Sequence, residues 1–273
     1  MFYRLSIGAV LNSTEQESSN GHRAMKILVI MPVPLPPEAV AGFAAQVPEG
    51  LMGSDVTLDF VGTRNGATIL DSHYELSLAD NFVLDAGCRA EEQGYDAVCI
   101  NSMSDSGLAA LRSRLSIPVV GPGEACFLTA AMLGKNIGVI TMWQPWHVLY
   151  TKTAQALGFQ DRLVSIRDIN VRPDTEELLT GKEHIVFDAL EREARLAIDT
   201  YGADVLILGS TTMHQSYNYL KERLEVPLLN PGLVALKQCE TLVRMQLSHS
   251  KRYYASPGVI NDELLTNVPN AFE

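Results

Sequence analysis

The chain has 273 residues, of which 47% are hydrophobic and 19% are charged, a composition typical of a globular protein and not of a disordered one. Its formal net charge of −11 at pH 7 argues against nucleic acid or an anionic membrane as the main partner, since both attract basic surfaces. No apolar run reaches the roughly 20 residues that a membrane-spanning helix needs. We therefore expect a small-molecule partner, with neither nucleic acid nor membrane involved.

The N-terminal segment differs in composition from the rest of the chain. Residues 1–24 combine a short apolar piece with a polar run rich in Ser, Asn, Glu and Gln. Because no signal-peptide core and cleavage site can be recognised there, we interpret 1–24 as a loose N-terminal extension. Met25 then opens an apolar strand, and Met25 is itself a candidate start of the protein.

Short β-branched runs alternate with helical stretches through the remainder of the chain. Amphipathic helices are predicted at 76–94 and 180–201. Strands are predicted at 27–31, 56–61, 97–101, 119–120, 137–141, 163–166, 205–208 and 228–229. This alternation predicts βαβ units, and therefore an α/β fold with parallel sheets.

The two halves of this pattern repeat each other. The stretch Gly94–Val98 corresponds to Gly202–Leu206, and Arg114–Val119 corresponds to Arg223–Leu228, in the same order and at nearly constant spacing. The sequence therefore predicts two similar lobes related by a pseudo-twofold axis, each with a parallel sheet flanked by helices, and an active-site cleft between them. We place the first lobe at 25–121 plus about 231–260, and the second at 122–230. The helix predicted at 234–247 is expected to cross back to the first lobe.

Hydroxyl side chains follow two equivalent strands of the predicted lobes. The segment after strand 97–101 reads NSMSDSG from Asn101, and the segment after strand 205–208 reads GSTTMH from Gly209. Ligands of open α/β sheets bind beyond the carboxyl ends of the strands, and hydroxyl groups at a helix start suit a carboxylate or a ring carbonyl. The pseudo-twofold axis would place Ser102 and Ser210 on opposite sides of one ligand. The alternative is that these hydroxyl groups only cap helices.

From Met25 to about Pro257 the chain resembles the aspartate/glutamate racemase superfamily, and within it the hydantoin and allantoin racemase branch. The first motif of that family is a cysteine followed, two residues on, by Gly/Ser-Asp-Pro-Gly-Leu, and here it reads SMSDSGL from Ser102. The second motif is Gly-Cys followed by small residues and Met, and here it reads GSTTM from Gly209. The segment ILDSHYE from Ile69 is similar to a further part of that branch.

The resemblance implies a cofactor-independent oligomeric enzyme in which two cysteines move a proton on opposite faces of the substrate. Both cysteine positions hold serine in this chain, at Ser102 and Ser210, and we expect these to be the catalytic residues. A cysteine thiol has a pKa near ~8.5, whereas an alcohol is a far weaker acid that needs a neighbouring group to react.

The expected function is that of an isomerase, a racemase acting at the carbon next to a carbonyl or carboxylate of a hydantoin or an amino acid. Three alternatives stay open. The serines could serve a lyase (decarboxylase) or a hydrolase in the same pocket. The protein could be an inactive ligand-binding homologue. The serines could also be engineered replacements of cysteine.

Further candidate site residues lie at strand ends or in the segments that resemble the family. His73 and His214 could supply a base to the serines. Asp105 could orient the first serine loop or cap a helix, and we expect the cap. Glu75 could be a general acid or base, and we expect an exposed helical glutamate. Trp143, Trp146 and His147 could cover a planar ring or only pack the lobes. The residues expected to bind substrate are Pro32, His73, Asn101, Met103, Thr141, Thr211, Thr212 and His214.

Cofactor and metal signatures are missing from the sequence. The six histidines show no HExxH pattern, and there is no GxGxxG or P-loop motif, so we expect neither a metal nor a nucleotide cofactor. The four cysteines stand in apolar surroundings without a CxxC pair, which indicates buried reduced thiols in a cytoplasmic protein.

Overall fold

The computed structural model describes residues 4–7, 24–173, 182–265 and 271. Its first sheet has the order β1-β3-β2-β4-β5. The strands are β1 (Arg4–Ile7), β2 (Met25–Met31), β3 (Val56–Gly62), β4 (Ala97–Ile100) and β5 (Val119–Val120). The pairings from β3 to β5 are parallel, and β1 pairs with β3 antiparallel at the edge of the sheet.

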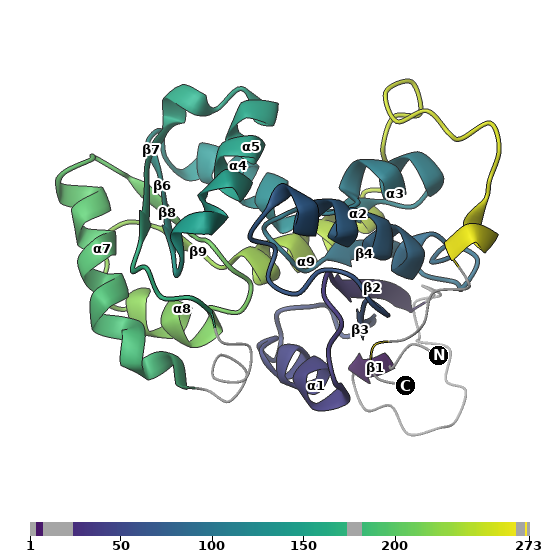
Figure 1. The fold of residues 1–273 in the computed structure, drawn as a ribbon, viewed down its shortest axis with the longest axis horizontal. Coiled ribbons are helices and arrows are strands. Elements are labelled where there is room, and N and C mark those ends of the chain that lie inside the picture. The colour runs from purple at the N-terminus through teal and green to yellow at the C-terminus, as the bar shows by residue number, and fades with distance from the viewer. Residues whose placement is uncertain (1–3, 8–23, 174–181, 266–270, 272–273) are drawn as a thin grey trace.

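The second sheet repeats the topology of the first. Its order is β7-β6-β8-β9, formed by β6 (Ile137–Thr141), β7 (Leu163–Asp168), β8 (Val205–Leu208) and β9 (Leu228–Leu229), all parallel. The order β3-β2-β4-β5 in the first lobe corresponds strand by strand to this second sheet. The predicted duplication is therefore a duplication of one folded unit, and Figure 1 shows the two lobes side by side.

Helices cover both faces of the first sheet. The helices of the described chain are α1 (Pro37–Ala45), α2 (His73–Gly87), α3 (Leu108–Arg114), α4 (Pro122–Leu133), α5 (His147–Leu157), α7 (Phe187–Asp199), α8 (His214–Leu220) and α9 (Pro231–Arg244). Along β2, Ile27 and Val29 pack with α1 and α9, while Leu28 and Ile30 pack with α2 and α3. Because both faces are covered, the strand is apolar and buried from Ile27 to Met31, as expected for a parallel sheet.

The repeated Gly-x-Asp sequence forms the same turn in both lobes. Asp96 accepts the backbone N–H of Lys26 at 2.8 Å, and Asp204 accepts that of Asn136 at 2.9 Å. The preceding Gly94 and Gly202 have φ values of 82° and 69°, a left-handed conformation that favours glycine. These bonds thus join the start of β4 to the start of β2 in the first lobe, and the start of β8 to the start of β6 in the second.

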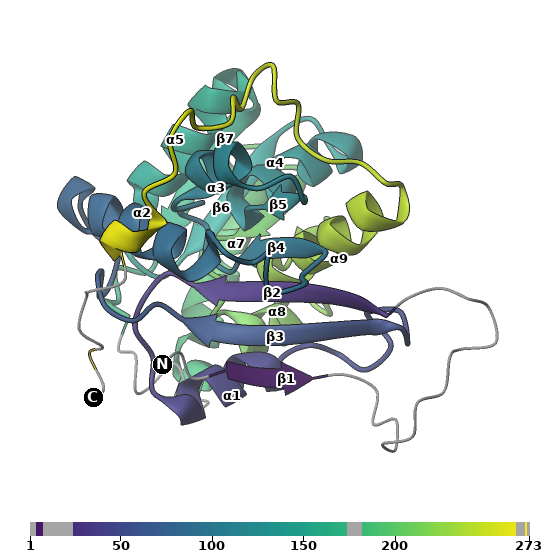
Figure 2. The same cartoon turned by 90° about the vertical axis from the view of Figure 1, so that its right-hand side faces the viewer.

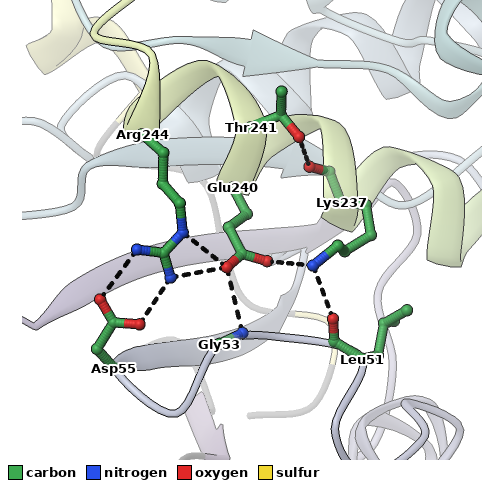
Figure 3. A network of polar contacts seen from close by, with 7 residues as sticks. All are labelled: Leu51, Gly53, Asp55, Lys237, Glu240, Thr241 and Arg244. Carbon is green, nitrogen blue, oxygen red and sulfur yellow. Dashed lines mark hydrogen bonds and ion pairs between the residues drawn. The ribbon is translucent and has the colours of Figure 1, made fainter.

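Helix α9 returns from the second lobe to the first, as the sequence predicts. Its buried Ala235, Leu236 and Cys239 belong to the same core as β2 and β3. Figure 3 shows the polar side of this contact, where the buried Glu240 carboxylate accepts the Gly53 N–H at 3.2 Å. The carboxylate also binds Lys237 Nζ at 2.7 Å and Arg244 Nε at 2.9 Å. Lys237 and Arg244 belong to α9 itself, so the bond to Gly53 is the one that attaches Glu240 to the loop before β3.

One part of the predicted N-terminal extension is corrected by the structure. Residues 4–7 form the edge strand β1, anchored by a hydrogen bond from Ser6 to the buried Asp59, whose other oxygen accepts the Tyr95 hydroxyl group. Figure 2 shows β1 beside β3 at the edge of the first sheet. Most of the remaining extension, residues 1–3 and 8–23, lies outside the described residues. Among the described helices, none is long and apolar enough to cross a membrane.

Candidate active site

A pocket lies between the lobes at the carboxyl ends of their strands. The first lobe contributes residues that follow β2, β3 and β4, and the second contributes residues that follow β6, β7 and β8. This is the edge where ligands of open α/β sheets bind. Ser102, just after β4, and Ser210, just after β8, both line the pocket. The structure thus brings the two predicted catalytic positions to one cavity.

The two serines sit in turns with the same hydrogen-bond pattern. Ser102 Oγ accepts the backbone N–H of Ser104 at 3.2 Å and lies 3.0 Å from Ser104 Oγ. Ser210 Oγ accepts the backbone N–H of Thr212 at 3.2 Å and lies 2.8 Å from Thr212 Oγ1. In the first lobe the chain of hydroxyl groups extends to the buried Ser106, 2.8 Å from Ser104. Hydrogen bonds donated to an oxygen stabilise its negatively charged form.

The two serine loops also contact each other. Thr211 Oγ1 donates a hydrogen bond of 3.0 Å to the carbonyl oxygen of Asn101, so the residue after Ser210 binds the residue before Ser102. Thr211, Asn101 and both serines line the same pocket. This bond fixes the two loops relative to each other across the boundary between the lobes.

The rest of the pocket wall is apolar. It includes Val33 and Leu35 after β2, Phe43 of α1, and Leu149 of α5. Among the described residues that line the pocket, none carries a charged side chain, and the polar side-chain groups are the hydroxyl groups, the Asn101 amide and the Trp146 indole N–H, which is bound to Ile69. A cavity of this kind suits a ligand with an apolar group and neutral polar atoms, because an unpaired buried charge is costly.

Five of the predicted substrate-binding residues line this pocket. They are Pro32, Asn101, Met103, Thr211 and Thr212. Their positions follow from the ends of β2, β4 and β8, which the sequence defined correctly. Thr141 lies outside the lining, because its buried hydroxyl pairs with Tyr150 Oη at 2.8 Å, beneath Gly209.

Neither of the two predicted histidine helpers lines the pocket. His73 is an exposed residue in the first turn of α2. His214, which begins α8, faces a smaller cavity behind the serine loops, where Nδ1 lies 3.5 Å from Asn230 and Nε2 lies 3.3 Å from Asn218. Burial, and secondarily the charge of Lys221, lower the His214 pKa. Spacing along the chain did not fix the direction of either ring.

The aromatic loop after β6 has some residues at the pocket and others that contact only the protein. Trp146 lines the pocket, and Trp143 packs against it edge-on, with ring centroids 6.5 Å apart. His147 is turned to Asp168, at 2.9 Å between Nε2 and a carboxylate oxygen, and does not line the pocket. Only Trp146 of this loop can therefore cover a ligand directly.

Asp105 joins the first serine loop to helix α4. Its carboxylate accepts the backbone N–H groups of Gly123 at 2.8 Å and Glu124 at 2.7 Å, which are free donors in the first turn of α4. Burial raises the pKa of Asp105 to about 7 in spite of these bonds. The residue thus caps a helix, as predicted, but it caps α4 and not the helix that follows its own loop.

The four cysteines are free and buried, and none lines the pocket. Burial raises the pKa of Cys88 to about 11 and raises those of Cys126 and Cys239 well above the ordinary value. No thiol therefore substitutes for the serines. Within the described ranges, no group of three or more His, Cys, Asp or Glu side chains is placed to hold a metal ion.

Several lining residues were missed because they carry no polar signal. Phe43, Leu149 and Pro173 come from segments far apart in the chain that gave no functional signal, whereas Ile69 and Leu70 lie in the segment similar to the racemase branch but were not themselves predicted to bind substrate. An apolar residue on a pocket wall has the same sequence pattern as one in a core. Only the folded arrangement identifies them.

Comparisons with known proteins agree with this geometry. The profile of the family described as "Asp/Glu/Hydantoin racemase" matches residues 38–239. A hydantoin racemase of Pseudomonas sp. (strain NS671) is 27% identical over 200 residues, 72% of this chain and 78% of that protein. A hydantoin racemase of Paenarthrobacter aurescens is 26% identical over 232 residues, 83% of this chain and 94% of that protein. The structure of allantoin racemase from Pseudomonas fluorescens superimposes with a TM-score of 0.78 at 28% identity, covering 87% of this chain and 99% of that one.

Proposed function

Because the chain belongs to the Asp/Glu/Hydantoin racemase family, we propose that it is a cofactor-independent racemase that inverts the carbon next to a carbonyl of a neutral cyclic amide of the hydantoin type. The observation that carries this proposal is the matched pair of serines. Ser102 and Ser210 line one pocket from equivalent turns of two equivalent lobes. Inversion through proton transfer needs one group on each face of the carbon, and a duplicated lobe supplies such a pair.

The reaction requires one serine as an alkoxide, whose oxygen takes the proton from the carbon, and the other as an alcohol, whose hydroxyl group gives a proton to the opposite face. The two serines exchange protonation states in each turnover. As the proton leaves the carbon, its electron pair moves to the adjacent carbonyl oxygen, and the proton delivered to the opposite face then restores the carbonyl. The backbone N–H groups of Ser104 and Thr212 support negative charge on the two serine oxygens. The hydroxyl groups of Ser104 and Thr212 can each donate a further hydrogen bond to the neighbouring serine oxygen, and that of Ser106 can donate in turn to Ser104.

The lack of charge on the described part of the pocket wall favours a neutral substrate over an amino acid. A free amino acid brings an ammonium and a carboxylate, each of which needs an oppositely charged or strongly polar partner when it is buried. A hydantoin ring is neutral, and its carbonyl and N–H groups match the hydroxyl groups and the Asn101 amide. The apolar wall suits an apolar substituent on the inverted carbon.

The proposal is tested by following optical rotation with separate enantiomers of 5-benzylhydantoin. Enzyme should bring both enantiomers to zero rotation faster than the uncatalysed reaction, with no change in substrate mass. Aspartate and glutamate enantiomers should keep their rotation. Loss of carbon dioxide or ring opening would instead identify a lyase or a hydrolase, and unchanged rotation with either hydantoin enantiomer would contradict racemase activity on this substrate class.

We further propose a cytoplasmic protein that assembles as a homo-oligomer. The buried free cysteines support a reducing compartment. Helix α4 supports assembly, because Leu128, Met132 and Leu133 are exposed by 46%, 84% and 51%, respectively. Light scattering should give more than the monomer mass, and Met132→Glu should shift it towards the monomer. A wild-type mass equal to that of the monomer would contradict assembly.

A further inference from the structure

One wall of the pocket is a loop whose backbone is bound by a single carboxylate. Thr68, Ile69 and Leu70 line the pocket after β3. Their three successive backbone N–H groups all donate to Oε2 of Glu75, at 2.8, 2.6 and 2.9 Å. Such a run of N–H groups forms a nest for an anion, and here the chain's own carboxylate fills it. Glu75 itself does not line the pocket.

The loop needs this support because of its backbone conformation. Leu70 has a φ of 59°, a left-handed conformation that residues with a side chain rarely adopt. The bond from the Leu70 N–H to Glu75 holds this conformation directly. Glu75 is held in turn by the start of α2, where its own backbone N–H donates to Ser72 Oγ at 3.3 Å. The carboxylate is therefore fixed to a helix while it binds the loop.

The opposite side of the loop is bound by the second lobe. Trp146 donates its indole N–H to the carbonyl oxygen of Ile69 at 2.8 Å, and the Trp146 side chain is almost fully buried. The same indole lines the pocket. The loop thus has its N–H groups held by the first lobe and a carbonyl group held by the second, at the rim of the cavity that contains both serines.

We propose that Glu75 is a positioning residue that, together with Trp146, holds loop 68–70 as a rigid wall of the substrate site. This inference rests on the proposed function, since it assigns the loop a part in binding the substrate of that reaction. Without Glu75 the loop would leave its left-handed conformation, the wall would move, and the indole would lose its acceptor. The expected defect is in substrate binding, with the chemistry at the serines preserved.

The first measurement does not depend on catalysis. Amide hydrogen exchange of peptides covering 68–70 should be slow in the wild type and at least about tenfold faster in Glu75→Ala, because the three donors lose their acceptor. Glu75→Gln keeps a carbonyl oxygen at this position and should give an intermediate rate. Glu222→Ala, which removes an exposed glutamate of the second lobe, should leave exchange unchanged. Equal exchange in the wild type and Glu75→Ala would overturn the proposal.

The second measurement separates positioning from general loss of structure. With 5-benzylhydantoin, KM should rise about tenfold in Glu75→Ala while kcat changes less than about threefold, and Glu75→Gln should recover part of the affinity. Trp146→Phe should also raise KM. In the double variant with Glu75→Ala, the loss of binding free energy should be smaller than the sum of the two single losses, since both residues act on one loop. A fall in kcat with unchanged KM would overturn the proposal. A wild type that fails to racemise the hydantoin would contradict the proposed function instead, whatever the exchange data show.

Discussion

Ser102 and Ser210 are equivalent residues of a duplicated lobe, and each accepts the backbone N–H of the residue two positions further on at 3.2 Å. This equivalence follows from the shared topology, because β4 and β8 occupy the same place in their sheets and each ends two residues before its serine. The two hydroxyl groups therefore have similar local chemistry. A reaction that can run from either enantiomer needs such a pair.

Replacing either serine singly should separate proton exchange from inversion. Ser102→Ala and Ser210→Ala each remove the proton-transfer group on one face, so racemisation of 5-benzylhydantoin should fall by about 10²–10⁴-fold. The remaining serine can still exchange the proton on its own face. Proton NMR in deuterium oxide should show exchange of one enantiomer in Ser102→Ala and of the other in Ser210→Ala.

Ser77→Ala is the matched control for these variants. Ser77 is an exposed serine of α2 whose hydroxyl binds the His73 carbonyl oxygen, away from the pocket lining. This variant should retain wild-type racemisation. If both alanine variants at the pocket racemised at the wild-type rate, the serines would have no part in the reaction.

Introducing cysteine at both serine positions should accelerate the reaction. A thiol ionises near pH 8.5, so the double variant Ser102→Cys, Ser210→Cys should exceed the wild-type rate by about tenfold or more at pH 8. Its rate should rise with pH towards the thiol pKa and fall above it, because one cysteine must be ionised and the other protonated. Polarimetry from pH 6 to 9 checks both expectations. A double variant slower than the wild type at every pH would show that the weak acidity of the serine hydroxyl groups does not limit the racemisation rate.

Removing the Glu240 carboxylate should weaken the attachment of α9 to the first lobe. Glu240 is 5% exposed and is bound by Gly53, Lys237 and Arg244 (Figure 3). Glu240→Ala should lower the free energy of unfolding by about 1–2 kcal/mol, because the Gly53 N–H loses its acceptor, whereas Lys237 keeps the Leu51 carbonyl oxygen and Arg244 keeps Asp55. Glu38→Ala, at an exposed position of α1, should change it by less than about 0.5 kcal/mol. Urea unfolding measures both, and equal effects would show that the network contributes no stability.

His249 should make stability fall in acid. The Val119 N–H donates to its Nε2 at 2.8 Å, which requires a neutral ring, and burial together with the charge of Arg112 lowers the His249 pKa to about 4. Between about pH 6.5 and 4 the unfolded chain binds the proton more readily, so the stabilising contribution is present above this window and lost as the pH falls through it. The loss should be on the order of 2 kcal/mol for this partly exposed ring.

His249→Gln tests the origin of this pH dependence. The glutamine side-chain oxygen can accept the same N–H without titrating. Urea unfolding at pH 7 and pH 4.5 should show a smaller decrease in stability for the variant than for the wild type. An identical decrease in both proteins would assign the acid sensitivity to other groups.

The strands and the serine loops were predictable because buried parallel strands are apolar throughout and end abruptly at polar residues. The ends of β4 and β8 placed Ser102 and Ser210, and the repeated Gly-x-Asp turns showed that their environments correspond. Thr141 also stands at a strand end, yet its hydroxyl binds Tyr150 within the core. The position of a residue at a strand end predicts the loop in which it lies. The direction of its side chain depends on contacts with the neighbouring helix.

The roles of residues at helix starts were harder to predict, because the direction of their side chains also depends on neighbouring elements. His214 follows Ser210 closely, but as the first residue of α8 it faces Asn230 and a second cavity. Glu75 reads as an exposed helical glutamate, and nothing in its sequence neighbourhood shows that the loop before α2 would fold back onto its carboxylate. Such contacts depend on backbone conformation at Leu70, which the sequence pattern does not encode.

Solvent deuterium incorporation by the unaltered protein tests the central claim most directly. Each enantiomer of 5-benzylhydantoin is incubated with enzyme in deuterium oxide, and the inverted product is analysed by mass spectrometry and proton NMR. If Ser102 and Ser210 transfer the proton between solvent and carbon, the product should carry one deuterium at the inverted carbon and form from both enantiomers. Enzyme-dependent inversion that retains the original hydrogen, or no enzyme-dependent exchange from either enantiomer, would contradict the two-serine mechanism.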